Sequence, residues 1–142
     1  KMLVATTNND VCITSDMTHW TPLSVKAHFP WPYCRAVMYV PDGFDELNPA
    51  DSGRVYVGAG NGPPGSEGGI FYTRDFGKSW SRAELGTTPN STIWCLTHHP
   101  AMSEWMVACS VSGQLFRSTD SGNSWSKLTH EFGEVRALAV VP

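Results

Sequence analysis

This chain lacks a long apolar run, an excess of basic charge and an apolar leader. No stretch approaches the roughly 18 consecutive apolar residues of a membrane-spanning helix, and residues 1–10 have no signal-peptide core. We therefore predict no membrane association and a cytoplasmic location. The net charge is −3, whereas a surface that binds nucleic acid is basic, so we expect no nucleic-acid partner.

The four cysteines also lack a recognisable spacing. Cys12, Cys34, Cys95 and Cys109 form no Cys-x-x-Cys pair, and all fall in predicted strands, so we interpret them as small buried hydrophobic residues rather than disulfide partners. His98 and His99 are adjacent on a predicted strand and point to opposite faces, so they do not share one ion easily. We predict no metal site and no cofactor.

What the chain does contain is a repeated motif. Residues 73–80 and 118–125 share the pattern Ser/Thr-x-Asp-x-Gly-x-Ser-Trp, and each copy follows a short apolar stretch. Residues 14–20 keep the Thr, Asp and Trp but are one residue shorter and lack the Gly. The structural positions of the motif are Asp16, Trp20, Asp75, Gly77, Trp80, Asp120, Gly122 and Trp125.

The motif predicts a turn between two antiparallel strands. Glycine supplies a position with positive φ, and the aspartate carboxylate accepts hydrogen bonds from N–H groups of its own turn. The tryptophan offers a large apolar plate that packs on a neighbouring unit, with one N–H to satisfy. These aspartates are therefore predicted to be structural.

This pattern resembles the Asp-box, or BNR, repeat of β-propellers similar to sialidases, sortilins and photosystem-assembly factors. The resemblance implies an all-β propeller of four-stranded antiparallel blades, with the motif away from any active site. If the strands of a blade are labelled A (inner) to D (outer), the single domain 1–142 is predicted to read B-C-D, A-B-C-D, A-B-C-D, A. The last strand, at residues 135–141, would complete the sheet begun by residues 2–6.

Three blades do not close a ring, since propellers have roughly four to eight. We predict that two copies form a six-bladed homodimer, and the alternative is that the chain is the C-terminal half of a longer propeller. Polar insertions at residues 42–53 and 61–68 explain the longer interval between the first two motifs.

Candidate ligand-binding residues lie at the predicted channel mouth and on the D–A and B–C loop face. Arg35, Trp94 and Arg136 each stand six residues before a proline and begin the inner strands. Converging guanidinium groups suit a carboxylate or phosphate, and an indole stacks on a sugar. The alternative is structural: the arginines pair with acids such as Glu134, and Trp94 packs in the core. The other loop-face candidates for ligand binding are His28, Trp31, Tyr33 and Glu134.

We nominate no catalytic residue. The function expected is a non-catalytic module that binds a small anionic or saccharide ligand, or a protein partner. A sialidase-like glycoside hydrolase is one alternative, because that family uses an arginine triad with a Tyr/Glu pair, but Trp94 occupies the place of a third arginine. The other alternative is an assembly factor. An enzyme would need paired carboxyl groups in a pocket, one with a raised pKa.

Overall fold

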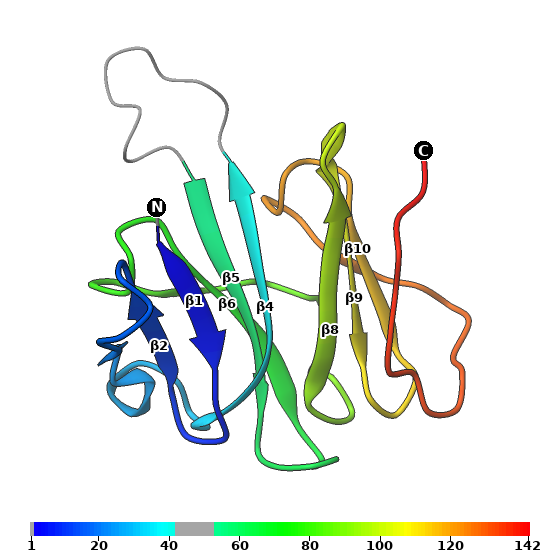
Figure 1. The fold of residues 1–142 in the computed structure, drawn as a ribbon. Helices are drawn as coiled ribbons and strands as arrows, with labels where there is room; N and C mark the ends of the chain where they lie inside the picture. The colour runs from blue at the N-terminus through cyan, green and yellow to red at the C-terminus, as the bar shows by residue number, and fades with distance from the viewer. Residues whose placement is uncertain (1, 42–52) are drawn as a thin grey trace.

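The computed structural model describes residues 2–41 and 53–142, which form three antiparallel sheets (Figure 1). The first sheet has three strands, β1 (Leu3–Thr6), β2 (Val11–Thr14) and β3 (Thr21–Pro22). The second has four, β4 (Tyr33–Pro41), β5 (Gly53–Gly60), β6 (Gly68–Thr73) and β7 (Ser81–Arg82). The third has β8 (Ile93–His99), β9 (Met102–Ser110), β10 (Leu115–Ser118) and β11 (Ser126–Lys127). The prediction of an all-β fold is confirmed.

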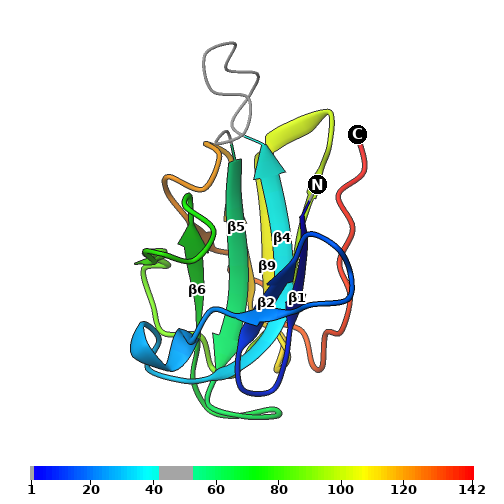
Figure 2. The same cartoon turned by 60° about the vertical axis from the view of Figure 1, so that its left-hand side comes forward.

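The strands follow one another in chain order within each sheet, so neighbouring strands of a sheet form hairpins. One short 3₁₀ helix, η1 (Val25–Ala27), lies between β3 and β4. The sheets stand side by side, and β4 lies next to both β1 and β8 (Figures 1 and 2). No helix among the described residues is long and apolar enough to cross a membrane.

Two apolar cores fill the spaces between sheets. The core between the first and second sheets contains Val11, Phe29, Val57 and Phe71. The core between the second and third sheets is built on fully buried Tyr56, Ile70, Ile93 and Phe116 among others. Because each sheet contributes side chains to its neighbour, burial of apolar surface holds the sheets together.

We call residues 14–20, 73–80 and 118–125 the aspartate turns. In the second turn the Asp75 carboxylate accepts from the Ser79 backbone N–H at 2.9 Å and from the Ser79 hydroxyl at 2.6 Å, while the Thr73 hydroxyl accepts from the Gly77 N–H at 2.8 Å. The third turn repeats these bonds between Asp120, Ser124, Ser118 and Gly122. Gly77 and Gly122 have φ of 89° and 79°, so the predicted turn chemistry is confirmed.

The first turn reaches the same closure with one residue fewer. His19 takes the place of the serine: its backbone N–H donates to Asp16 at 2.8 Å, and its Nδ1 lies 2.7 Å from the other carboxylate oxygen. Met17 adopts a φ of 62°. The residues after the aspartate in the other two turns, Phe76 and Ser121, adopt the same left-handed conformation with φ of 55° and 59°, so this feature is common to all three turns.

The tryptophans of the second and third turns pack on the preceding sheet. Trp80 packs against the core between the first and second sheets, and Trp125 is buried in the core between the second and third. Both indole N–H groups are buried without a hydrogen-bond partner among the described residues. This corrects our expectation of a bonded N–H; apolar contact of the ring accounts for the packing.

Residues 129–142 contain no strand. The predicted inner strand at residues 135–141 is therefore not formed within the chain, and no pairing with β1 occurs among the described residues. The segment instead runs along the third sheet (Figure 1), and the Val135 N–H donates to the carbonyl of Val111, directly after β9, at 3.0 Å. A strand needs a partner, and the side of this segment away from the third sheet has none among the described residues. Most of the predicted insertion at residues 42–53 lies outside the described residues.

Candidate functional site

Two of the predicted ligand-binding residues, both arginines, lie over the indole ring of a third, Trp94. The guanidinium carbon of Arg35, in β4, lies 4.2 Å from the centroid of the Trp94 ring, and that of Arg136 lies 5.6 Å from it. Trp94 is in β8, and Arg136 lies in the segment that runs along the third sheet. Guanidinium groups stack favourably on aromatic faces. We call Arg35, Trp94 and Arg136 the Arg–Trp–Arg cluster.

The cluster is open to solvent and carries net positive charge. Both arginines are exposed and Trp94 is half-buried. Arg136 forms an ion pair with Glu134 through its Nε, as the structural alternative expected, whereas Arg35 forms no ion pair with any residue that the structure describes. Two positive charges therefore meet one negative charge here, which leaves one guanidinium free to bind an anion.

The loop-face candidates do not join this cluster. His28 is exposed at the end of η1, and Tyr33 begins β4, paired with Gly60 of β5. Trp31 packs against the core between the first two sheets, and the Arg82 guanidinium carbon lies 5.3 Å from its ring centroid. The sequence predicts the loop-face and channel-mouth candidates as two sets, and Trp31 of the loop-face set packs away from the Arg–Trp–Arg cluster.

The packing of Phe29 accounts for the position of Trp31. It stacks on Phe71 with ring centroids 4.0 Å apart and meets Trp80 edge-on, so the loop that carries Trp31 is held against the second sheet. Sequence reasoning missed Arg82 as the partner of Trp31, and nothing in the local sequence of either residue points to the other.

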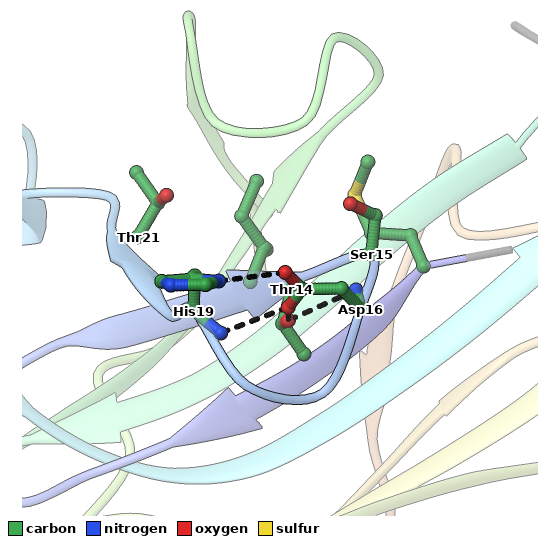
Figure 3. A pocket seen from close by; sticks show the side chains of 7 residues that line it. Thr14, Ser15, Asp16, His19 and Thr21 are labelled. Atoms are coloured by element: carbon green, nitrogen blue, oxygen red, sulfur yellow. Dashed lines mark hydrogen bonds and ion pairs between the residues drawn. The ribbon is translucent and has the colours of Figure 1, made fainter.

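A second polar site, which sequence reasoning did not single out, is a pocket beside the first aspartate turn. Figure 3 shows Asp16 and His19 joined by a hydrogen bond in its lining. The cavity has a volume of about 200 Å³ and is lined also by Met2, Ile13, Thr14, Ser15 and Thr21. Hydrogen bonds from the His19 backbone and ring and from Thr18 hold the pKa of Asp16 well below its usual range. Because both carboxylate oxygens already accept hydrogen bonds within the turn, the pocket offers a ligand little unpaired charge.

A larger cavity of about 570 Å³ lies between the loops that follow β7 and β11, with Gly86, Gln114, Trp125 and Glu131 among its lining residues. Glu131 is engaged by Lys127 at 2.6 Å and by the Gln114 amide at 3.2 Å. These two donors lower the pKa of Glu131. The charges that line this cavity are therefore neutralised by one another.

No feature in residues 2–41 and 53–142 favours acid–base catalysis. The carboxyl groups there with a clear pKa shift are Asp16, Asp75, Asp120 and Glu131, and all four are shifted down by hydrogen bonds. A general acid working near neutral pH would need the opposite shift. Nor do three or more His, Cys, Asp or Glu side chains in these ranges come together in a metal-binding arrangement.

Three neighbouring antiparallel sheets of consecutive hairpins, packed through their faces, define a β-propeller-like all-β fold. Comparison with protein families is consistent with that architecture. The model of the Sortilin-Vps10 family, described as sortilin, neurotensin receptor 3, matches residues 46–138. That match covers more than half of the chain, and the chain belongs to this family. A comparison with curated proteins finds no match.

Proposed function

We propose that this chain is a non-catalytic propeller module that binds a small ligand carrying a carboxylate or phosphate group at the Arg–Trp–Arg cluster. The observation that carries the proposal is the convergence of Arg35 and Arg136 on the Trp94 ring from two separate segments. The ring orients both guanidinium groups, and Arg35 keeps its hydrogen-bond donors available for an anion.

The indole ring of Trp94 makes the site suitable for sugars that carry an acidic group. Trp94 is half-buried, so part of its ring surface reaches solvent beside the two guanidinium groups. An aromatic face packs well on the apolar face of a sugar ring, and a carboxylate on that sugar would reach an arginine. We therefore favour an acidic saccharide within the class of small anionic ligands.

Titration calorimetry with glucuronate as the probe tests this proposal. Arg35→Gln and Arg136→Gln should each weaken binding about tenfold or more, since a hydrogen bond to a charged group contributes about 1.5–3 kcal/mol. Arg82→Gln is the matched control, because Arg82 is also exposed and stacked on a tryptophan. Glucose separates the contribution of charge from that of stacking. Equal binding by the wild type and both cluster variants would refute the proposal.

We further propose that the three sheets are Asp-box blades of one propeller and that a second copy of the chain completes the ring. The internal repeat supports this. Trp80 and Trp125 both pack on the sheet that precedes their own. The equivalent Trp20 belongs to the first sheet, which no described sheet precedes, and it is 42% exposed. The first sheet also lacks an inner strand. Residues 135–141 of a partner chain would supply that strand, and the partner's sheet would cover Trp20.

Light scattering on a sizing column tests ring closure. A mass of twice one chain is expected, and a strictly monomeric chain would contradict closure by a second copy. In that case the remaining blades would come from a longer chain, which is the second arrangement that the sequence predicts. The cytoplasmic location stays a prediction.

A further inference from the structure

Two cysteines of the third sheet face each other on adjacent strands. Cys95 of β8 and Cys109 of β9 are direct partners in the antiparallel register. Residues directly opposite in such a pair have Cα atoms about 4.5 or 5.5 Å apart, and their side chains project from the same face. Both separations lie within the roughly 4.4–6.8 Å that disulfides span. The two thiols therefore meet the backbone requirement of a disulfide, although both are reduced here.

The fold itself does not require cysteine at these positions. In the second sheet the pair that directly follows the equivalent bulge is Ala36 and Gly58. In the third sheet the pair that directly follows the bulge is Cys95 and Cys109. Since alanine and glycine fill this place in one sheet, thiols are not needed to pack it in the other.

The two thiols differ in pKa and in burial, so Cys95 is the more reactive of the two and Cys109 is protected. The neighbouring Cys109 thiol, with a smaller contribution from the backbone of Leu138, lowers the pKa of Cys95 to about 6. The same interaction and burial raise the pKa of Cys109. Cys95 is half-buried and Cys109 fully buried. By contrast, burial raises the pKa of Cys34 to about 12.

The pair also holds the segment that carries Arg136. The Cys109 Sγ donates a hydrogen bond to the Val135 carbonyl oxygen at 3.8 Å. Arg136 is the residue directly after this attachment point, and its stacking partner Trp94 is the residue before Cys95. A change in the bonding of the two sulfurs thus acts directly on two members of the Arg–Trp–Arg cluster.

We propose that Cys95 and Cys109 form a reversible cross-strand disulfide, and that its formation weakens anion binding at the Arg–Trp–Arg cluster by loosening the segment at Val135 and Arg136. The second half of this inference rests on the proposed function. Oxidation removes the S–H that donates to the Val135 carbonyl, so the segment loses this attachment to the third sheet.

The oxidant is a small-molecule disulfide such as glutathione disulfide. The Cys95 thiolate attacks one sulfur of that disulfide, forming a mixed disulfide and releasing one small thiolate. Cys109 then loses its proton, and its thiolate attacks the Cys95 sulfur, which forms the protein disulfide and releases the second small thiolate. The two protons from the cysteines end on the two released thiols, and two electrons pass from the protein to the small disulfide.

Peptide mapping after oxidation tests the bond itself. The chain is incubated with glutathione disulfide and then alkylated. We expect the peptides that contain Cys95 and Cys109 to be linked, with Cys12 and Cys34 alkylated. Cys109→Ser should leave glutathione attached to Cys95, and Cys12→Ser, a strand cysteine with no cysteine partner, should map like the wild type. Alkylation of all four cysteines, or a disulfide between any other pair, would overturn the proposal.

Glucuronate titration of the reduced and oxidised chains tests the coupling. The oxidised chain should bind several-fold more weakly, and the double variant Cys95→Ala, Cys109→Ala should bind equally before and after oxidant treatment. Unchanged affinity on oxidation, with Arg35→Gln still impaired, would overturn the coupling and leave the proposed function standing. Absence of binding in every form would instead overturn the proposed function, while the mapped disulfide would still stand.

Discussion

Trp80 meets Phe29 edge-on, with ring centroids 4.9 Å apart and planes at 87°. Phe29 follows the first sheet and Trp80 follows β6 of the second, so this contact joins two sheets through residues far apart in the chain. Edge-to-face pairs contribute about 0.5–1.5 kcal/mol beyond the burial of their area. The tryptophans of the second and third aspartate turns thus link those turns to the sheet that precedes each of them.

Removal of a buried turn tryptophan should destabilise the chain. We expect Trp125→Ala to lower the free energy of unfolding by about 3–5 kcal/mol, because it leaves a large cavity between the second and third sheets. Urea unfolding followed by circular dichroism measures the loss. A change below about 1 kcal/mol would show that this ring does not hold the sheets together.

Trp20 should instead affect assembly. It is the equivalent residue in the first turn and is 42% exposed, so Trp20→Ala should change the stability of a single chain much less than Trp125→Ala does. If a second copy covers this residue, the variant should shift the light-scattering mass from two chains toward one. A variant with the wild-type mass at all concentrations would argue against an interface at this face.

The aspartate turns should make the stability of the fold depend on pH in the acidic range. Hydrogen bonds from Ser79, through its hydroxyl and its N–H, hold the pKa of Asp75 at about 2, below the ordinary value of 3.8. A carboxyl whose pKa is lowered by folding stabilises the fold above its unfolded pKa, and this contribution is lost as the pH falls through the folded pKa. The melting temperature should therefore fall between about pH 4 and pH 2.

The variant that tests this dependence is Asp75→Asn, which keeps one oxygen to accept a turn hydrogen bond. Its melting temperature should be lower than that of the wild type at neutral pH and should approach it at pH 2. Glu84→Gln removes a negative charge from an exposed residue outside the turns and serves as the control. Parallel pH profiles of wild type and Asp75→Asn would contradict this assignment.

Gly122 should be sensitive to a single added methyl group. Its φ is 79°, and a Cβ at this position would collide with the Tyr56 hydroxyl. Alanine with positive φ costs about 1–2 kcal/mol, and the collision adds to that cost. Gly86→Ala is the control, because Gly86 has a φ of 75° with open space around its Cβ position. If both variants lose the same stability, the Tyr56 contact contributes nothing.

The sequence predicts the parts of the fold that depend on neighbours in the chain. The turns close with atoms of Thr73, Asp75 and Ser79, which lie within seven residues of one another in the repeat. Strand positions follow from apolar stretches beside those turns. Residues 135–141 form no strand within the chain, since a strand there depends on a partner that the rest of the described chain does not provide.

Contacts between sheets were predicted only where the repeat gave equivalent positions. Arg35, Trp94 and Arg136 were grouped by their common distance from a proline, and the structure brings them together. Arg82 with Trp31, and Cys95 with Cys109, were missed. The first pair depends on how Phe29 packs. The second depends on a bulge after Ile93 that shifts the register, and no sequence pattern marks that bulge.

The self-contained bonding of the aspartate turns has a consequence for combinations of mutations. Among residues 2–41 and 53–142, the carboxylate of each turn accepts hydrogen bonds only from residues of its own turn. Damage to one turn should then leave the bonding of another intact, and free-energy losses at separate, non-contacting sites add. The losses in the free energy of unfolding caused by a variant in the second turn and a variant in the third should therefore add in the double variant. The chain should remain folded with one defective turn and unfold only when several turns are damaged.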